Sequence, residues 1–157
     1  MKALFAEKVG VKNVLLADLN TTFVTTRIKM DKSYNVAFVI DTASAAVDLT
    51  VDAIQSNAAT AGTSKALDTK KSYYTKVAAE TSFTKVELSV PDASLVLPVF
   101  NAAAGTLILE YGANELDSEG GYYWIGLNFA DPGAARLINV TAYAVDPKTG
   151  SAHSIVL

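Results

Sequence analysis

The stretch VDLTVDAI, residues 47–54, alternates apolar and polar side chains from Val47 to Asp52. Val47, Leu49 and Val51 are apolar, and the residues between them are Asp, Thr and Asp. Successive side chains of a β-strand point to opposite faces of the sheet, so this alternation predicts a strand with one buried face.

Six further stretches have the composition or alternation of strands. They are YNVAFVID (34–41), FTKVELSV (83–90), LVLPVF (95–100), TLILEY (106–111), GYYWIGLNFA (121–130) and RLINVTAYAV (136–145). Pro98 has no N–H to donate, which predicts an edge position or a bulge for its strand. We expect eight or nine strands between Thr21 and Leu157, with helix limited to single turns near Ala113–Leu116 and Val14–Leu19.

The segments between these stretches are rich in Gly, Pro, Asn and Asp, as in DSEGG, DPGAA and DPKTG. These residues preset turns or accept a positive φ. Turns at such short spacing predict an all-β fold, a single antiparallel β-sandwich of jelly-roll type. The expected domain covers residues 21–157, and residues 1–20 are expected to be an N-terminal arm or an edge segment.

Composition excludes several classes of protein. The 157 residues contain no cysteine, which excludes disulfides and thiolate metal sites. A net charge of −3 without a basic stripe argues against nucleic-acid binding. The apolar runs are far shorter than the ~20 residues that span a bilayer. Met1–Gly10 lacks the long apolar core of a signal peptide, so we expect synthesis in a cytoplasm.

Residues 113–131, ANELDSEGGYYWIGLNFAD, contain three carboxylates that could bind a metal or form an acid/base pair. A calcium loop of the EF-hand type needs a Glu at its twelfth position, which is missing here. An acid/base pair needs one carboxyl in an apolar pocket, and both Asp117 and Glu119 are expected to be solvated. We therefore interpret Asp117–Gly121 as a turn whose glycines permit unusual backbone angles.

The sequence offers no recognisable catalytic machinery. His153 is the only histidine, which excludes a site built on two imidazoles, and neither G-x-S-x-G nor a phosphate-binding glycine motif occurs. We predict that the chain is not an enzyme and has no catalytic, metal-binding or cofactor-binding residue. The seven tyrosines and one tryptophan could form a sugar-binding face, although core packing explains scattered aromatic residues more often.

The N-terminal stretch MKALFAEKVGV, residues 1–11, has no clear hydrophobic period. It could pack as an edge strand on its own domain. The favoured hypothesis is an arm that becomes ordered against a neighbouring subunit or another protein. The expected partner contacts are Lys2, Leu4, Phe5, Lys8 and Val9.

The order of three features resembles a family of capsid decoration proteins, encoded among the structural genes of tailed bacteriophages. After YNVAFVID comes VDLTVDAIQSNAATAGTSKAL (47–67), similar to the family's strand, Gln-containing turn and small-residue loop ending in Lys-Ala-Leu. An acidic turn of the type Leu-Asp-x-x-x-Gly-Phe then opens a long strand, and RLINVTAYAVDP (136–147) fits the last strand. The matching residues are Gln55, Gly62, Thr63, Lys65, Ala66, Leu67, Leu116, Asp117, Gly121 and Tyr122, whereas Ala61 and Ser64 depart from the pattern and Tyr122 replaces Phe.

This resemblance covers roughly residues 34–147 and implies a virion structural protein on the capsid surface. Its expected partners are the major capsid protein and further copies of itself, as a trimer or else a dimer. No nucleic acid, membrane or cofactor is expected to bind. The alternative from another class is a carbohydrate-binding β-sandwich of a virion, which would recognise the host surface.

Overall fold

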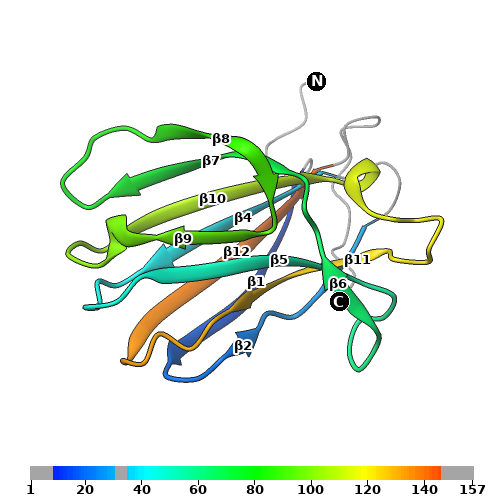
Figure 1. The fold of residues 1–157 in the computed structure, drawn as a ribbon, viewed down its shortest axis with the longest axis horizontal. Helices are drawn as coiled ribbons and strands as arrows, with labels where there is room; N and C mark the ends of the chain where they lie inside the picture. The colour runs from blue at the N-terminus through cyan, green and yellow to red at the C-terminus, as the bar shows by residue number, and fades with distance from the viewer. Residues whose placement is uncertain (1–8, 31–34, 146–157) are drawn as a thin grey trace.

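Two antiparallel sheets of six strands form the fold in the computed structural model, which describes residues 9–30 and 35–145 (Figure 1). The first sheet has the order β1 (Val9–Leu19), β12 (Arg136–Val145), β4 (Asn35–Thr42), β10 (Gly105–Gly112), β7 (Lys70–Val77) and β8 (Thr84–Asp92). The second has β2 (Phe23–Val24) and β3 (Ile28–Lys29) on one side of β11 (Trp124–Phe129), followed by β5 (Leu49–Ser56), which pairs with β6 (Ser64–Ala66) and β9 (Ser94–Leu97). The expected all-β antiparallel sandwich is confirmed.

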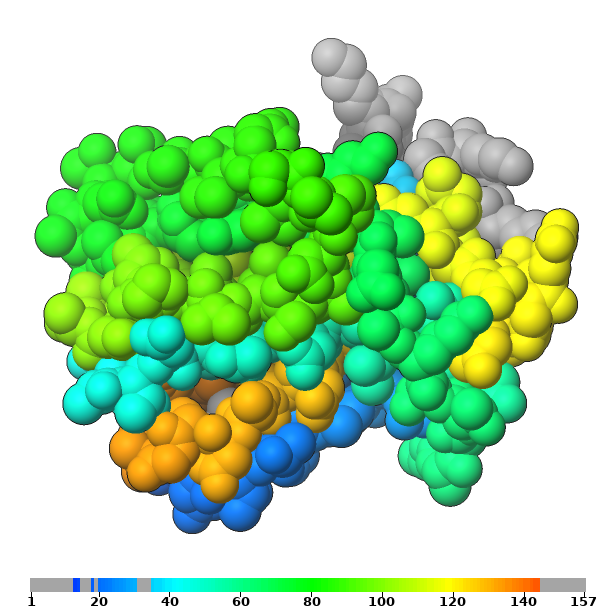
Figure 2. Space-filling model, in the orientation of Figure 1, coloured from blue at the N-terminus to red at the C-terminus, as the bar shows by residue number. Residues whose placement is uncertain are grey.

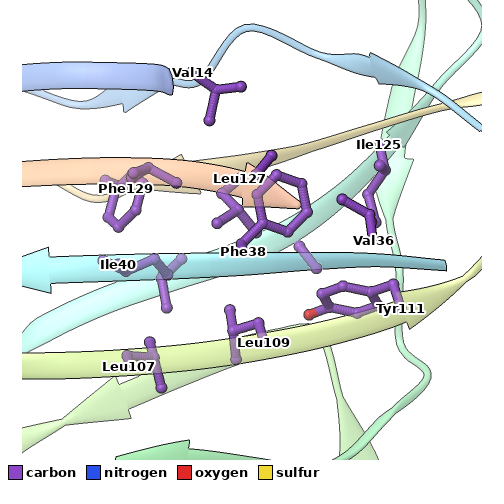
Figure 3. Packing of buried hydrophobic residues seen from close by; sticks show 14 of the residues in the cluster. Val14, Val36, Phe38, Ile40, Leu107, Leu109, Tyr111, Ile125, Leu127 and Phe129 are labelled. Atoms are coloured by element: carbon purple, nitrogen blue, oxygen red, sulfur yellow. The ribbon is translucent and has the colours of Figure 1, made fainter. Parts of the chain in front are cut away.

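The core lies between the two sheets and follows the predicted alternation. In β5, Leu49, Val51 and Ala53 are buried, while the residues between them are partly exposed. Side chains from the two inner faces meet in one apolar cluster (Figure 3). Its fully buried members include Phe38, Ile40, Leu107 and Leu109 from the first sheet and Ile125, Leu127 and Phe129 from the second.

One of the two expected helical turns is confirmed. A 3₁₀ turn, η2, spans Ala113–Glu115. The turn expected near Val14–Leu19 is wrong, because those residues belong to β1, which pairs with β12 on both sides of a bulge at Val14. Leu and Ala favour helix locally, but the pairing with β12 decides the conformation.

Pro98 ends its strand rather than interrupting it. β9 stops at Leu97, and Pro98 opens a second 3₁₀ turn, η1 (Pro98–Phe100), whose Phe100 is fully buried. The predicted edge position is confirmed, because β9 pairs with β5 alone among the residues that the structure describes.

The described residues contain more strands than expected. Eleven follow Thr21, where the sequence predicted eight or nine. The additional strands include β2, β3 and β6, which have two or three residues each, and β7, whose most deeply buried residues are polar.

Candidate functional site

The acidic turn joins η2 to β11 and has the expected structure. The Gly121 N–H donates to the Ser118 carbonyl (3.1 Å), and the Tyr122 N–H donates to the Asp117 carbonyl (3.0 Å). Gly121 has a φ of 82°, which an L-residue with a Cβ adopts only at a cost. The interpretation of this stretch as a turn is therefore confirmed.

Asp117 does more in this turn than the sequence suggested. Its carboxylate accepts hydrogen bonds from the Lys65 ammonium (2.5 Å) and from the Gly120 N–H (2.9 Å). These two contacts, the first being the stronger, lower the pKa of Asp117 below its usual range. The expectation that Asp117 is only a solvated turn residue is wrong in this respect, although its side chain remains 39% exposed.

Four residues from the stretches that carry the family resemblance meet at this turn, and we call them the motif corner: Gln55, Lys65, Asp117 and Tyr122. The Gln55 carbonyl oxygen accepts a hydrogen bond from the Asp117 N–H (2.8 Å). The Gln55 amide donates to the Ala66 carbonyl (3.2 Å), and the Lys65 ammonium lies 4.5 Å from the centre of the Tyr122 ring. The corner thus ties β5, β6 and the acidic turn together.

The side chain of Arg27 holds the loop between β5 and β6. The Arg27 guanidinium donates to the Ser56 hydroxyl (2.9 Å) and to the carbonyls of Ala58 (3.2 Å) and Thr60 (3.1 Å). A Cβ on Gly62 would lie 2.6 Å from that of Ala58, so only glycine fits this loop as it stands. Figure 2 shows the loop in green beside the yellow acidic turn, at one end of the molecule.

The three carboxylates of the acidic stretch do not gather into one site. Glu115 accepts a hydrogen bond from the Thr69 hydroxyl (3.1 Å), Asp117 pairs with Lys65, and Glu119 is exposed. Within residues 9–30 and 35–145, no group of three His, Asp or Glu side chains could hold a metal ion.

A groove of about 640 Å³ lies at the end of the first sheet and was not predicted from the sequence. It is lined by residues that include Lys70, Lys71, Tyr74, Glu110, Tyr111 and Tyr143. The Lys70 ammonium donates to the Glu110 carbonyl and lies 4.1 Å from the centre of the Tyr111 ring. Burial lowers the pKa of Lys70, against the opposing charges of Glu115 and Glu110, and burial raises the pKa of Tyr111.

The sequence signal for this groove is weak. Its residues come from four strands that are distant in the chain, and no motif joins them. Lys70 is also one of two adjacent lysines, a pattern that usually marks a solvated surface.

The expected partner contacts fall mostly outside the described residues. Lys2, Leu4, Phe5 and Lys8 lie there, as does His153. Val9 begins β1, and its backbone is opposite Val145 of β12. For Val9–Leu19, the edge-strand alternative is therefore the observed one, while the arm hypothesis stays a prediction for residues 1–8.

The comparisons with known proteins find no similarity: no family model matches the chain, and no curated protein or solved structure matches it either. The resemblance described above therefore rests on the quoted residues. Among the described residues, no helix has the length and apolar character needed to cross a membrane.

Proposed function

We propose that this chain is a structural protein of a tailed-phage virion, which binds the outside of the capsid and bridges its subunits. The observation that supports this proposal is the motif corner. Four of the ten residues that match the family pattern, drawn from two separate stretches, are in direct contact, as expected if the pattern describes one structural unit.

The proposed role is to bind proteins, not to convert a substrate. The motif corner and Arg27 fix two loops at one end of the sandwich, and fixed loops lose little conformational freedom on binding. Each contact with the major capsid protein needs only modest affinity, because many copies bind one shell and linked sites add avidity. The proposed protein is made in the host cytoplasm and acts on the capsid surface as a homo-oligomer.

The N-terminal residues are the proposed capsid contact. In this arrangement Phe5 is the apolar anchor, with Leu4 beside it, and Lys2 and Lys8 lie at the rim. An arm of this kind becomes ordered only on binding, which costs affinity but allows it to reach across a subunit boundary.

Co-sedimentation with capsids tests the proposal directly. The capsids should be assembled from the major capsid protein encoded next to this chain's gene; the absence of such a neighbour would itself count against the proposal. We expect the chain to sediment with these shells in a saturable manner. Phe5→Ala should weaken binding, whereas Phe23→Ala, at a 40% exposed phenylalanine of β2, should not. A chain that stays in the supernatant would refute the proposed function.

The groove favours a second candidate, carbohydrate binding. It contains the half-buried Tyr74 and Tyr143 together with charged and amide side chains, and sugars stack on aromatic rings while hydrogen-bonding to polar groups. A glycan array followed by calorimetry would test this. Tyr74→Ala and Tyr143→Ala should then abolish binding, and Tyr123→Ala, an exposed tyrosine outside the groove, should not. No binding to any glycan would exclude the candidate.

A further inference from the structure

Strand β8 is an edge of the first sheet. On one side it pairs with β7, and within residues 9–30 and 35–145 no strand pairs with its other side (Figure 1). Nearly all of its residues are exposed, and the most buried are the half-buried Val86 and Leu88. An unpaired edge presents a row of N–H and C=O groups that can template a further strand.

The two faces of β8 differ in character. Val86 is opposite Tyr73, and both point toward the core side of the sheet together with Leu88. Lys85 and Glu87 point to the outer face, where they form an ion pair and their side chains are 48% and 65% exposed. The segment Thr84–Leu88 therefore carries one positive and one negative charge, placed symmetrically about Val86.

We propose that β8 binds β8 of a second copy of this chain, antiparallel, across a two-fold axis at Val86. In this register Lys85 of each copy is opposite Glu87 of the other, so two complementary ion pairs form on the outer face. Val86 meets its own counterpart on the inner face. The two first sheets would join into one continuous sheet, and the two-fold symmetry closes the assembly at a dimer, the second of the two symmetries expected from the sequence.

The charges of Lys85 and Glu87, and the face of the sheet to which each side chain points, together select this register. A shift by one residue would place Lys85 opposite an apolar residue of the inner face. A shift by two residues would place either Lys85 opposite Lys85 or Glu87 opposite Glu87, and like charges directly opposite each other are destabilising. Only the register centred on Val86 places inner-face residues opposite inner-face residues and pairs Lys85 of each copy with Glu87 of the other.

A bulge limits the length of the paired segment. β7 places Ser72 opposite Glu87 but Lys70 opposite Asp92, so the residues between Glu87 and Asp92 leave the regular ladder. Val90 lies there and is 70% exposed. Pairing is therefore confined to Thr84–Leu88. In so short a segment, the two ion pairs supply much of the difference in free energy between one register and another.

Two charge-reversed variants test this inference. Lys85→Glu gives a chain with two negative charges on the segment, and Glu87→Lys gives one with two positive charges. Each alone should be monomeric in sedimentation equilibrium at a concentration where the parent is dimeric. Mixed in equal amounts they should form a one-to-one dimer, because every charge then faces its opposite.

The double variant Lys85→Glu/Glu87→Lys is the matched control, since it restores complementarity and should dimerise like the parent. Melting curves of all variants at low concentration would show that each chain is folded. A monomeric parent, or single variants that dimerise as well as the parent, would overturn the inference. So would two folded single variants that stay monomeric when mixed. The experiment contains no capsid, so its outcome is independent of the proposed function.

Discussion

At the scale of single residues, Asp117 links the acidic turn to the neighbouring loop. Its carboxylate holds the Lys65 ammonium and the Gly120 N–H at the same time. Glu119, two residues further on, is exposed. We expect Asp117→Ala to lower the melting temperature, whereas Glu119→Gln should change stability by no more than about 0.5 kcal/mol. Calcium should shift neither variant nor the parent, and a calcium-dependent rise in the parent alone would contradict the turn interpretation.

The pH dependence of stability gives a second test of Asp117. Its pKa is lower in the folded chain than the 3.8 of a free aspartate, so the folded state favours the ionised carboxylate. The resulting stabilisation is present above the unfolded-state pKa and is lost as pH falls through the folded-state pKa. The difference in melting temperature between the parent and Asp117→Asn should therefore be largest near neutral pH and shrink in acid. A difference that is constant across this range would mean that the carboxylate charge contributes nothing.

Gly121 is the residue of the turn whose backbone demands glycine. Nothing lies within 4 Å of a Cβ built there, so the strain comes from its φ of 82° alone. Gly121→Val should lower the free energy of unfolding by about 1 kcal/mol or more. Gly121→Asn should lower it less, because Asn tolerates this conformation better. Urea denaturation would measure both. Equal losses for the two variants would show that crowding, and not backbone conformation, sets the cost.

Gly120 is constrained for a different reason. A Cβ there would lie 2.5 Å from an Asp117 carboxylate oxygen, so Gly120→Ala should displace that carboxylate. The loss of unfolding free energy caused by Gly120→Ala should then be smaller in an Asp117→Ala background than in the parent, because both substitutions remove the same contact. A double-mutant cycle measures this coupling. Additive losses would contradict the geometry of the turn.

At the scale of elements, the alternating strands could be predicted because burial on one face leaves a period of two. β4, β5 and β12 lie within two residues of their expected bounds. β7 was missed because its deeply buried side chains are Lys70 and Thr75, and buried polar residues give no hydrophobic period. β2, β3 and β6 are too short to show any period.

β1 begins at Val9, so the arm hypothesis applies only to residues 1–8. Val9–Leu19 pairs with β12, so deletion of residues 1–8 should keep the circular dichroism spectrum and the two-state melt of the full chain. If residues 1–8 form the arm, the same deletion should abolish attachment to capsids. Deletion through Leu19 should destabilise the domain, because β12 would lose one of its two partner strands. A chain lacking residues 1–8 that binds capsids as well as the full chain would refute the arm.

At the scale of the whole molecule, the order of the stretches in the sequence and the contacts between their residues in the fold gave different information. The order of three stretches suggested the family, and Gln55, Lys65, Asp117 and Tyr122 could be named from it. Their contact could not be predicted, because it depends on how β5, β6 and the acidic turn pack at one end of the sandwich. The groove around Lys70 left only a weak sequence signal, since four strands must assemble before it exists.

The stability of capsids with and without this chain tests the central claim most directly. Shells built from the proposed partner, the major capsid protein, would be heated alone and with increasing amounts of the purified chain, and their dissociation would be followed by calorimetry. The account predicts that the dissociation temperature rises and then levels off when a fixed number of copies is bound per shell. A dissociation temperature that does not change at saturating chain would contradict it.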